Sequence, residues 1–370
     1  MSRFSSALHD PAVSARVGRW LGICFGTAFL TGVISHWAQL PVPPVPFPTS
    51  PSWGYRVTQG LHVVSGTAAV PLLLVKLWSV YPRLFRRPPR EARALALEVV
   101  DRVSVGVLVA SGIFLLVTGL ANATQWYPWS FSFRPTHYAV AWVAIGALVA
   151  HLGIKAAAIR DGLAGTLDER GPVGLSRRGL LRAAYGASAV AVLGTAGGAV
   201  PWLRQVSVFG VTTGDGSQGL PVNRTAAEAG VDDGVTGADF RLTVVHGDRS
   251  VALSRDDLAA MPQHTEELPI ACVEGWSASG RWTGVRMRDL LDLVDAPAGS
   301  DVAVSSLQTR YAFARSTLPG NFADDPRTLL ALALSGEPLD LDHGYPCRVI
   351  APNRPGVLQT KWVTSLEVAT

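Results

Sequence analysis

Five long apolar segments constrain this 370-residue chain more than any other feature; they cover about residues 17–37, 56–79, 103–121, 136–159 and 183–203. Each is long enough to cross a bilayer, which takes roughly 20 apolar residues. The whole chain is apolar as well, with a mean hydropathy of +0.25 and only 16% charged residues. We therefore expect an N-terminal all-α membrane bundle of five transmembrane helices, embedded in membrane lipid.

Arginines gather in alternate loops between these segments. The arginine-rich stretches contain Arg3, Arg16 and Arg19; then Arg83, Arg86, Arg87, Arg90 and Arg93; then Arg160, Arg170, Arg177, Arg178 and Arg182. The intervening loops carry only Arg134. Because positive loops stay inside, we expect a multi-pass protein of the cell membrane with a cytoplasmic N-terminus and an extracytoplasmic C-terminal domain. An interfacial position for one segment would reverse this orientation. The pI near 9.1 reflects these loops, so we expect no nucleic acid partner.

A distinctive arginine-containing motif precedes the fifth apolar segment. Ser176-Arg-Arg-Gly-Leu-Leu-Arg182 precedes an Ala/Gly-rich stretch and resembles an internal twin-arginine translocation signal, the kind that exports folded domains. Two stop-transfer arginines are the alternative. The predicted organisation is a four-span membrane domain at 1–175, this motif with the fifth helix at 176–203, a Gly/Ser/Thr/Asp-rich linker at 204–236, and an extracytoplasmic domain at 237–370.

Three histidines in the apolar segments are candidate haem iron ligands: His62, His137 and His151. His137 and His151 are 14 residues apart, so they share a helix face about 21 Å apart. His62 lies on the second segment at a depth similar to that of His137. The arrangement is similar to cytochrome b561-type anchors, which implies haem b at an outer site. The alternatives are histidines hydrogen-bonded at span ends, or His36 as the outer ligand.

The remainder of the chain, from about residue 239, has a mixed α/β pattern. Strands are predicted at 240–245, 302–306 and 348–351. Short helices are predicted at 254–260, with Ser254 as a cap, and at 285–293, and a further helix within 321–334.

Two motifs and a lysine in this region carry a family resemblance. The motifs are Ile270-Ala-Cys-Val-Glu-Gly-Trp276 and Asp342-His-Gly-Tyr-Pro-Cys-Arg348, and Lys361 follows 13 residues later. Together they resemble the sulfite oxidase superfamily, in the branch that contains the protein-methionine-sulfoxide reductase catalytic subunits. The resemblance implies an α+β sulfite-oxidase-type molybdopterin-binding domain and a Mo-molybdopterin cofactor. It makes Cys272 the catalytic residue and the molybdenum ligand, since a thiolate is a soft donor for such a metal.

The same resemblance assigns cofactor-binding residues: Asn223, Ser306, His343, Arg348, Gln359, Thr360 and Lys361. Arg348 and Lys361 are suited to charge-assisted bonds with the pterin phosphate, and His343 to a ring donor. Residues expected at the mouth of the site are Glu274, Trp276, Arg310 and Tyr311. Cys347 is read as a core residue. For Cys272, a buried structural thiol and a cysteine–histidine hydrolase nucleophile are the alternatives.

The predicted function is that of a membrane-anchored, molybdopterin-dependent oxidoreductase with an extracytoplasmic site. The resemblance implies two-electron oxygen-atom transfer, acting on small-molecule or protein sulfoxides, N-oxides or sulfite-like anions. A membrane quinone or a redox protein is the expected electron partner. The alternative is a non-catalytic membrane sensor or ligand-binding protein that retains the fold.

Overall fold

The computed structural model describes residues 8–40, 42–82, 88–167, 176–209, 216–232, 237, 239–310 and 313–369. The chain divides into two compact units. The helical unit comprises Met1–Val33, Gly60–Gly197 and Trp202–Gly210, and the α/β unit comprises Ile34–Gln59, Gly198–Pro201 and Val211–Thr370. Some residues named from the sequence lie outside the described ranges: Arg3, Arg83, Arg86, Arg87, Arg170 and Tyr311.

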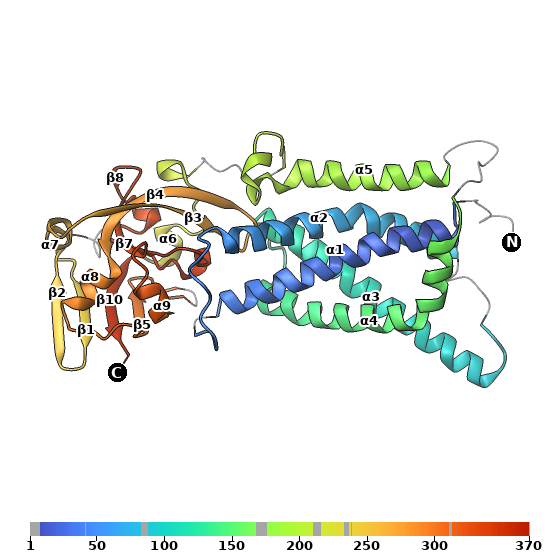
Figure 1. Ribbon diagram of the computed structural model, residues 1–370, viewed down its shortest axis with the longest axis horizontal. Coiled ribbons are helices and arrows are strands. Elements are labelled where there is room, and N and C mark those ends of the chain that lie inside the picture. Colours follow the sequence, from blue (N-terminus) through green and yellow to red (C-terminus); the bar gives the residue numbers. More distant parts are fainter. Residues whose placement is uncertain are drawn as a thin grey trace. The chain divides into compact units, whose positions relative to one another are not determined.

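All five expected apolar segments are helices that are long and apolar enough to cross a membrane (Figure 1). They are α1 (Pro11–Ala38), α2 (Gly54–Val80), α3 (Ala92–Ala123), α4 (Phe133–Ala164) and α5 (Arg177–Thr195). Neighbouring helices run in opposite directions, since Lys76 on α2 bonds Ser14 while His62 bonds Ala28. This is the up-down arrangement expected of helices joined in sequence by short loops.

An arginine from α1 binds the C-terminal end of α4. The guanidinium of Arg16 donates to the carbonyls of Gly162, Leu163 and Gly165 at distances of 2.9 to 3.1 Å. These carbonyls have no intrahelical partner, and a cation complements the negative end of the helix dipole. A Cβ atom at Gly162 would lie 2.8 Å from Ala15 Cβ and from Pro11 O, so glycine permits this close crossing.

The fifth helix begins and ends earlier than the 183–203 segment suggested. Ser176 caps it by accepting a bond from Gly179 N at 3.0 Å. After Thr195 the chain turns through two short 3₁₀ segments, at Ala196–Gly198 and Pro201–Leu203. A glycine pair followed by proline disfavours a continuing helix, which explains the early end.

The α/β unit contains two five-stranded sheets. The first has the order β2-β1-β10-β5-β6, and only the β1–β10 pair is parallel. Its strands are β1 (Leu242–His246), β2 (Arg249–Leu253), β5 (Val302–Ser306), β6 (Arg315–Leu318) and β10 (Val363–Val368). The strand predicted at 302–306 is confirmed with identical bounds, and the one predicted at 240–245 is confirmed with a shift.

The second sheet is antiparallel and has the order β3-β4-β7-β8, with β9 also paired to β7. Its strands are β3 (His264–Ala271), β4 (Ser277–Arg286), β7 (Leu329–Leu334), β8 (Glu337–Pro338) and β9 (Arg348–Ile350). Short helices connect the sheets: α6 (Ala226–Ala229), α7 (Arg255–Ala260), α8 (Met287–Asp292) and α9 (Gly320–Ala323). Both predicted helices α7 and α8 are confirmed, including the cap at Ser254.

The range 321–334 was predicted to contain a helix, and it does so only at its start. Only α9 is helical there, and Leu329–Leu334 forms the strand β7 between β4 and β9. Leucine and alanine favour helices in isolation, but this run is apolar on both faces and almost wholly buried. Tertiary burial therefore overrides the local preference.

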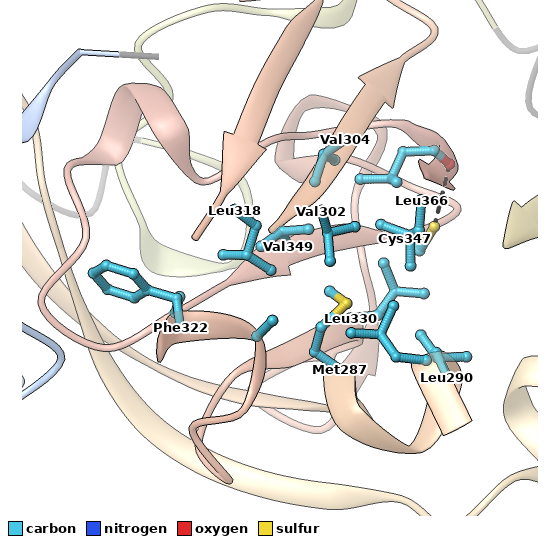
Figure 2. Close-up of a cluster of buried hydrophobic side chains, with 14 of the residues drawn as sticks. Met287, Leu290, Val302, Val304, Leu318, Phe322, Leu330, Cys347, Val349 and Leu366 are labelled. Atoms are coloured by element: carbon cyan, nitrogen blue, oxygen red, sulfur yellow. Dashed lines mark hydrogen bonds between the residues drawn. The ribbon is translucent and has the colours of Figure 1, made fainter. Parts of the chain in front are cut away.

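The main core contains residues of both sheets and is built mostly from aliphatic side chains, with Met287 and aromatic residues such as Phe322 (Figure 2). Cys347 is part of it: its side chain is fully buried, and its thiol donates to Val363 O at 3.4 Å. Burial raises the pKa of this thiol to about 12. Cys347 is therefore the core residue that the sequence predicted.

Candidate active site

Cys272 lies in a tight loop between β3 and β4. The backbone N–H of Cys272 donates to Trp276 O at 2.8 Å, and Gly275 N donates to Cys272 O at 3.2 Å. Gly275 has a φ of 81°, a left-handed conformation that glycine adopts without strain. Because Ala271 and Ser277 pair in register, the two strands hold both ends of the loop.

Two polar side chains contact the Cys272 sulfur. Asn223 Nδ2 lies 3.6 Å from Sγ, and Sγ lies 3.7 Å from Glu274 Oε2. The Glu274 carboxylate also accepts from Trp276 Nε1 at 3.2 Å. Burial and the Glu274 carboxylate raise the pKa of the Cys272 thiol well above its usual range. A thiolate here therefore requires a compensating positive charge such as a metal ion.

Arg348 and Lys361 are two basic side chains that interact electrostatically, and Lys361 also interacts electrostatically with Cys272. Arg348 is 5% exposed and donates to His343 O at 3.0 Å and Gln359 O at 3.1 Å, while its guanidinium lies 5.0 Å from the Trp282 ring centroid. Lys361 Nζ donates to Arg224 O at 2.5 Å and Asp342 O at 2.8 Å. Arg224 directly follows Asn223, so Lys361 and Cys272 belong to one continuous site.

Burial lowers the proton affinity of both basic side chains, and the Arg348 charge lowers that of Lys361 further. Burial lowers the pKa of Arg348 to about 9. Burial and the nearby Arg348 charge lower the pKa of Lys361 to about 7. Gly344 lets the two side chains converge: its φ is 109°, and a Cβ there would lie 3.0 Å from Lys361 Cβ and 3.2 Å from Arg348 Cβ.

His343 contacts a segment whose role the sequence did not reveal. Its Nε2 lies 2.6 Å from Ser217 O, so Nε2 carries the proton and donates, which leaves Nδ1 as an acceptor. Burial and the Arg348 charge lower the pKa of His343 to about 4, so the ring is neutral at pH 7. The Ser217 hydroxyl is buried without a hydrogen-bond partner. No sequence motif marked this serine, which reaches the site only through tertiary folding.

The side chains of the predicted residues Gln359, Thr360 and Ser306 make hydrogen bonds within the domain. The side chain of Gln359 hydrogen-bonds the backbone: it accepts from Ala351 N at 2.7 Å and donates to Ala351 O at 2.9 Å. The Thr360 hydroxyl pairs with Ser316 at 2.9 Å. Ser306 Oγ donates to Lys361 O at 2.7 Å.

The site has the character of an anion-binding pocket. Arg348 Nε is buried without a hydrogen-bond partner, and the pKa of both Arg348 and Lys361 is depressed. A bound phosphate would supply acceptors and restore the favourable charge balance. A soft sulfur donor in the same site as two buried basic side chains fits a metal–dithiolene group that carries a phosphate.

The helical unit brings two of the three candidate haem ligands together. The ring centroids of His62 and His137 lie 6.4 Å apart with an interplanar angle of 63°. His62 Nδ1 lies 2.9 Å from Ala28 O and 3.2 Å from Thr31 Oγ1, and His137 Nδ1 lies 3.0 Å from Thr118 Oγ1. His151 is instead within electrostatic range of Lys76, Lys155 and Asp101.

Comparisons with known proteins give one family match and several relatives. Residues 229–370 match the family model described as an oxidoreductase molybdopterin binding domain. The chain is 32% identical over 136 residues to YedZ1 of Azospira oryzae, whose name provisionally assigns it to a protein-methionine-sulfoxide reductase, with 36% of this chain and 50% of that one covered. It is 30% identical over 157 residues to the mitochondrial sulfite oxidase of Drosophila melanogaster, covering 35% of this chain and 27% of that one.

The chain thus spans about half the length of YedZ1 and about a quarter of the sulfite oxidase. Among solved structures, sulfane dehydrogenase SoxCD of Paracoccus pantotrophus has a TM-score of 0.33 at 21% identity, covering 35% of this chain and 38% of that one. That score is too low to carry an argument. Residues 229–370 thus match an oxidoreductase molybdopterin binding domain, and the chain is similar to a sulfite oxidase over 157 residues.

Proposed function

We propose that the protein is a membrane-anchored, molybdopterin-dependent oxidoreductase that transfers oxygen atoms outside the cytoplasm. The observation that carries this proposal is the continuous site from Cys272 through Asn223 to Lys361 and Arg348. Cys272 would ligate molybdenum through its sulfur. Arg348 and Lys361 would bind the pterin phosphate, and the Ser217 hydroxyl and His343 Nδ1 lie in the same region.

When bound, the molybdenum cofactor supplies two-electron redox chemistry at oxygen. The residues of this chain would bind it and shield it from water. Asn223 holds an amide donor against the sulfur, and Trp276 holds Glu274 in place. We infer a small-molecule or protein sulfoxide, an N-oxide or a sulfite-like anion as substrate, because each exchanges one oxygen atom with a metal centre.

The test of this proposal is the metal and pterin content of the full-length protein, purified from a host that makes the cofactor. We expect about one molybdenum per chain, as for single-cysteine sites, and reduced content in Lys361→Met. If metal and pterin were absent although the domain is exported and folded, the protein would instead be a sensor or ligand-binding protein that retains the fold.

We infer a membrane orientation with the α/β unit outside the cytoplasm. The support is the alternation of arginine-rich and arginine-poor loops, together with the Arg177-Arg178 pair at the start of α5. In the folded protein Arg177 pairs with Asp10 at 2.9 Å, a contact compatible with either a twin-arginine signal or a stop-transfer role. Accessibility of a tag after residue 370 to protease in spheroplasts tests the orientation.

We also propose that His62 and His137 hold a b-type haem that exchanges electrons with quinone or a redox protein. Histidine imidazoles are common ligands of haem iron, so His62 and His137, whose rings lie close together, would hold the group, and it would supply one-electron redox chemistry. The observed separation is 6.4 Å. The Nδ1 contact of His62 with a carbonyl directs its proton there, which leaves Nε2 free to bind metal.

The haem proposal has a spectroscopic test with an internal control. Dithionite-reduced membranes should show a b-type α-band that is lost in both His62→Ala and His137→Ala. His151→Ala should retain it, because His151 faces charged side chains rather than a second histidine. A band that survives both of the first two substitutions would exclude this ligand pair.

A further inference from the structure

The connection between α1 and α2 is built into the α/β unit. Residues Ile34–Gln59 belong to this unit. They comprise the end of α1, the connection and the first turns of α2. Phe47 and Tyr55 are buried in the main core, with Tyr55 only 1% exposed. Their rings stack edge to face at 6.4 Å. A solvent-covered loop would not bury aromatic side chains, so this segment, residues 42–55 including the first residues of α2, is a structural strap across the domain.

Polar contacts fix the strap at several points. Asn353 Oδ1 accepts from Tyr55 N at 2.5 Å, and Asn353 Nδ2 donates to Pro48 O at 2.7 Å. Asn321 Nδ2 donates to Phe47 O at 2.9 Å. These bonds anchor the strap independently of the Cys272 loop.

Arg56, in the first turn of α2, contacts the strand that closes the Cys272 loop. Its Nε donates to Ser277 Oγ at 2.6 Å, and its Nη2 donates to Ser279 Oγ at 2.7 Å. Ser277 and Ser279 are alternate residues of β4 and therefore face the same side of the sheet. A planar guanidinium fork can bond both hydroxyls at once, whereas a lysine ammonium presents one point charge.

Ser277 is the residue directly after the loop. It is 1% exposed and pairs with Ala271, which directly precedes Cys272. A displacement of Ser277 would therefore move both ends of the loop that carries the sulfur. The Cys272 N–H bond to Trp276 O closes the same loop from inside.

We propose that Arg56 is a positioning residue for the Cys272 loop and holds the sulfur in register with the rest of the cofactor site. The role of the positioned sulfur as a metal ligand rests on the proposed function, but the contact does not. The helix that enters the apolar region thus also fixes the geometry of the active-site loop. Arg56 touches no reacting atom and acts only through β4.

The test uses full-length protein in detergent micelles, from a host unable to make the pterin, so that the result is independent of metal. Hydrogen exchange of peptides covering 270–278 is compared among wild type, Arg56→Gln, Arg56→Lys and the control Arg281→Gln. Arg281 lies on the same strand with an exposed side chain. A second readout is the rate at which iodoacetamide alkylates Cys272, with the buried core thiol Cys347 as an internal reference.

We expect about tenfold faster exchange and Cys272 alkylation in Arg56→Gln, as the loss of two hydrogen bonds implies. Arg56→Lys should be intermediate, and Arg281→Gln and the Cys347 rate should match wild type. An unchanged Cys272 rate in Arg56→Gln would overturn the proposal. So would equal acceleration of Cys272 and Cys347, since that would show general loosening of the domain. Absence of molybdenum from protein made in a competent host would refute the proposed function and leave this result intact.

Discussion

Substitution of Asn353 offers a quantitative test of how the strap is held. Asn353 is 3% exposed and adopts a φ of 56°, so Asn353→Gly removes its side chain without adding the left-handed penalty that alanine would meet. The substitution removes the acceptor for Tyr55 N and the donor to Pro48 O. The bond from Asn353 N to Ser52 O remains.

The expected loss of stability follows from the exposure of the two groups left without a hydrogen-bond partner, the Tyr55 N–H and the Pro48 carbonyl. Tyr55 is buried, so its N–H loses a partner that water cannot replace, which costs about 1–3 kcal/mol. Pro48 is exposed, so its carbonyl turns to water and the loss is about 0.5–1.5 kcal/mol. The strap should therefore open more easily by about 1.5–4.5 kcal/mol, which corresponds to about 10- to 1,000-fold.

Hydrogen exchange of peptides covering 42–56 measures this opening directly in the full-length protein. The matched control is Asn321→Ala, which removes one exposed donor to Phe47 O and should accelerate exchange by no more than about tenfold. If Asn353→Gly exchanged within about threefold of wild type, the two hydrogen bonds of the Asn353 side chain would not be what holds the strap. A larger effect in Asn321→Ala than in Asn353→Gly would contradict the burial argument.

Three further predictions concern the active site. Gly344→Ala should lower the unfolding temperature and the molybdenum content together, because the new Cβ lies 3.0 Å from Lys361 Cβ at a φ that disfavours alanine; normal content at normal stability would contradict this. Lys361 has a folded pKa near 7, below its unfolded value, so the unfolded chain binds more protons between pH 7 and 9. The cofactor-free protein should therefore gain stability as pH rises from 7 to 9, and thermal melts of Lys361→Met should lack that slope. Cys347→Ala should keep its molybdenum and lose about 1–2 kcal/mol of stability through the small cavity; metal loss in this variant would reassign the ligand.

Local patterns were sufficient to predict the features that depend on local chemistry. Apolar length alone located the five helices, and the Ser254 cap located α7. The short apolar run before Cys272 was not predicted as a strand, although it forms the end of β3. The leucine-rich run at 329–334 was misread because burial on both faces, which only the fold reveals, decides its structure.

The long-range contacts of the site could not be predicted from the sequence. Ser217 and Arg56 reach the site across more than a hundred residues of chain, and neither belongs to a recognisable motif. The proline-rich connection was expected to be only a loop, whereas its aromatic residues complete the core. Asn223, the residue with the weakest motif, contacts the Cys272 sulfur.

The central claim is that Cys272 is the protein ligand of a molybdenum–pterin cofactor. The most direct measurement is metal and pterin analysis of full-length wild type beside Cys272→Ser, both purified from a host that makes the cofactor. The account predicts about one molybdenum and one pterin per wild-type chain. It predicts that Cys272→Ser retains pterin through Arg348 and Lys361 but loses oxygen-atom transfer and the sulfur signature of the metal site in X-ray absorption. A wild-type protein without metal or pterin, or a Cys272→Ser protein with unchanged metal–sulfur coordination, would contradict it.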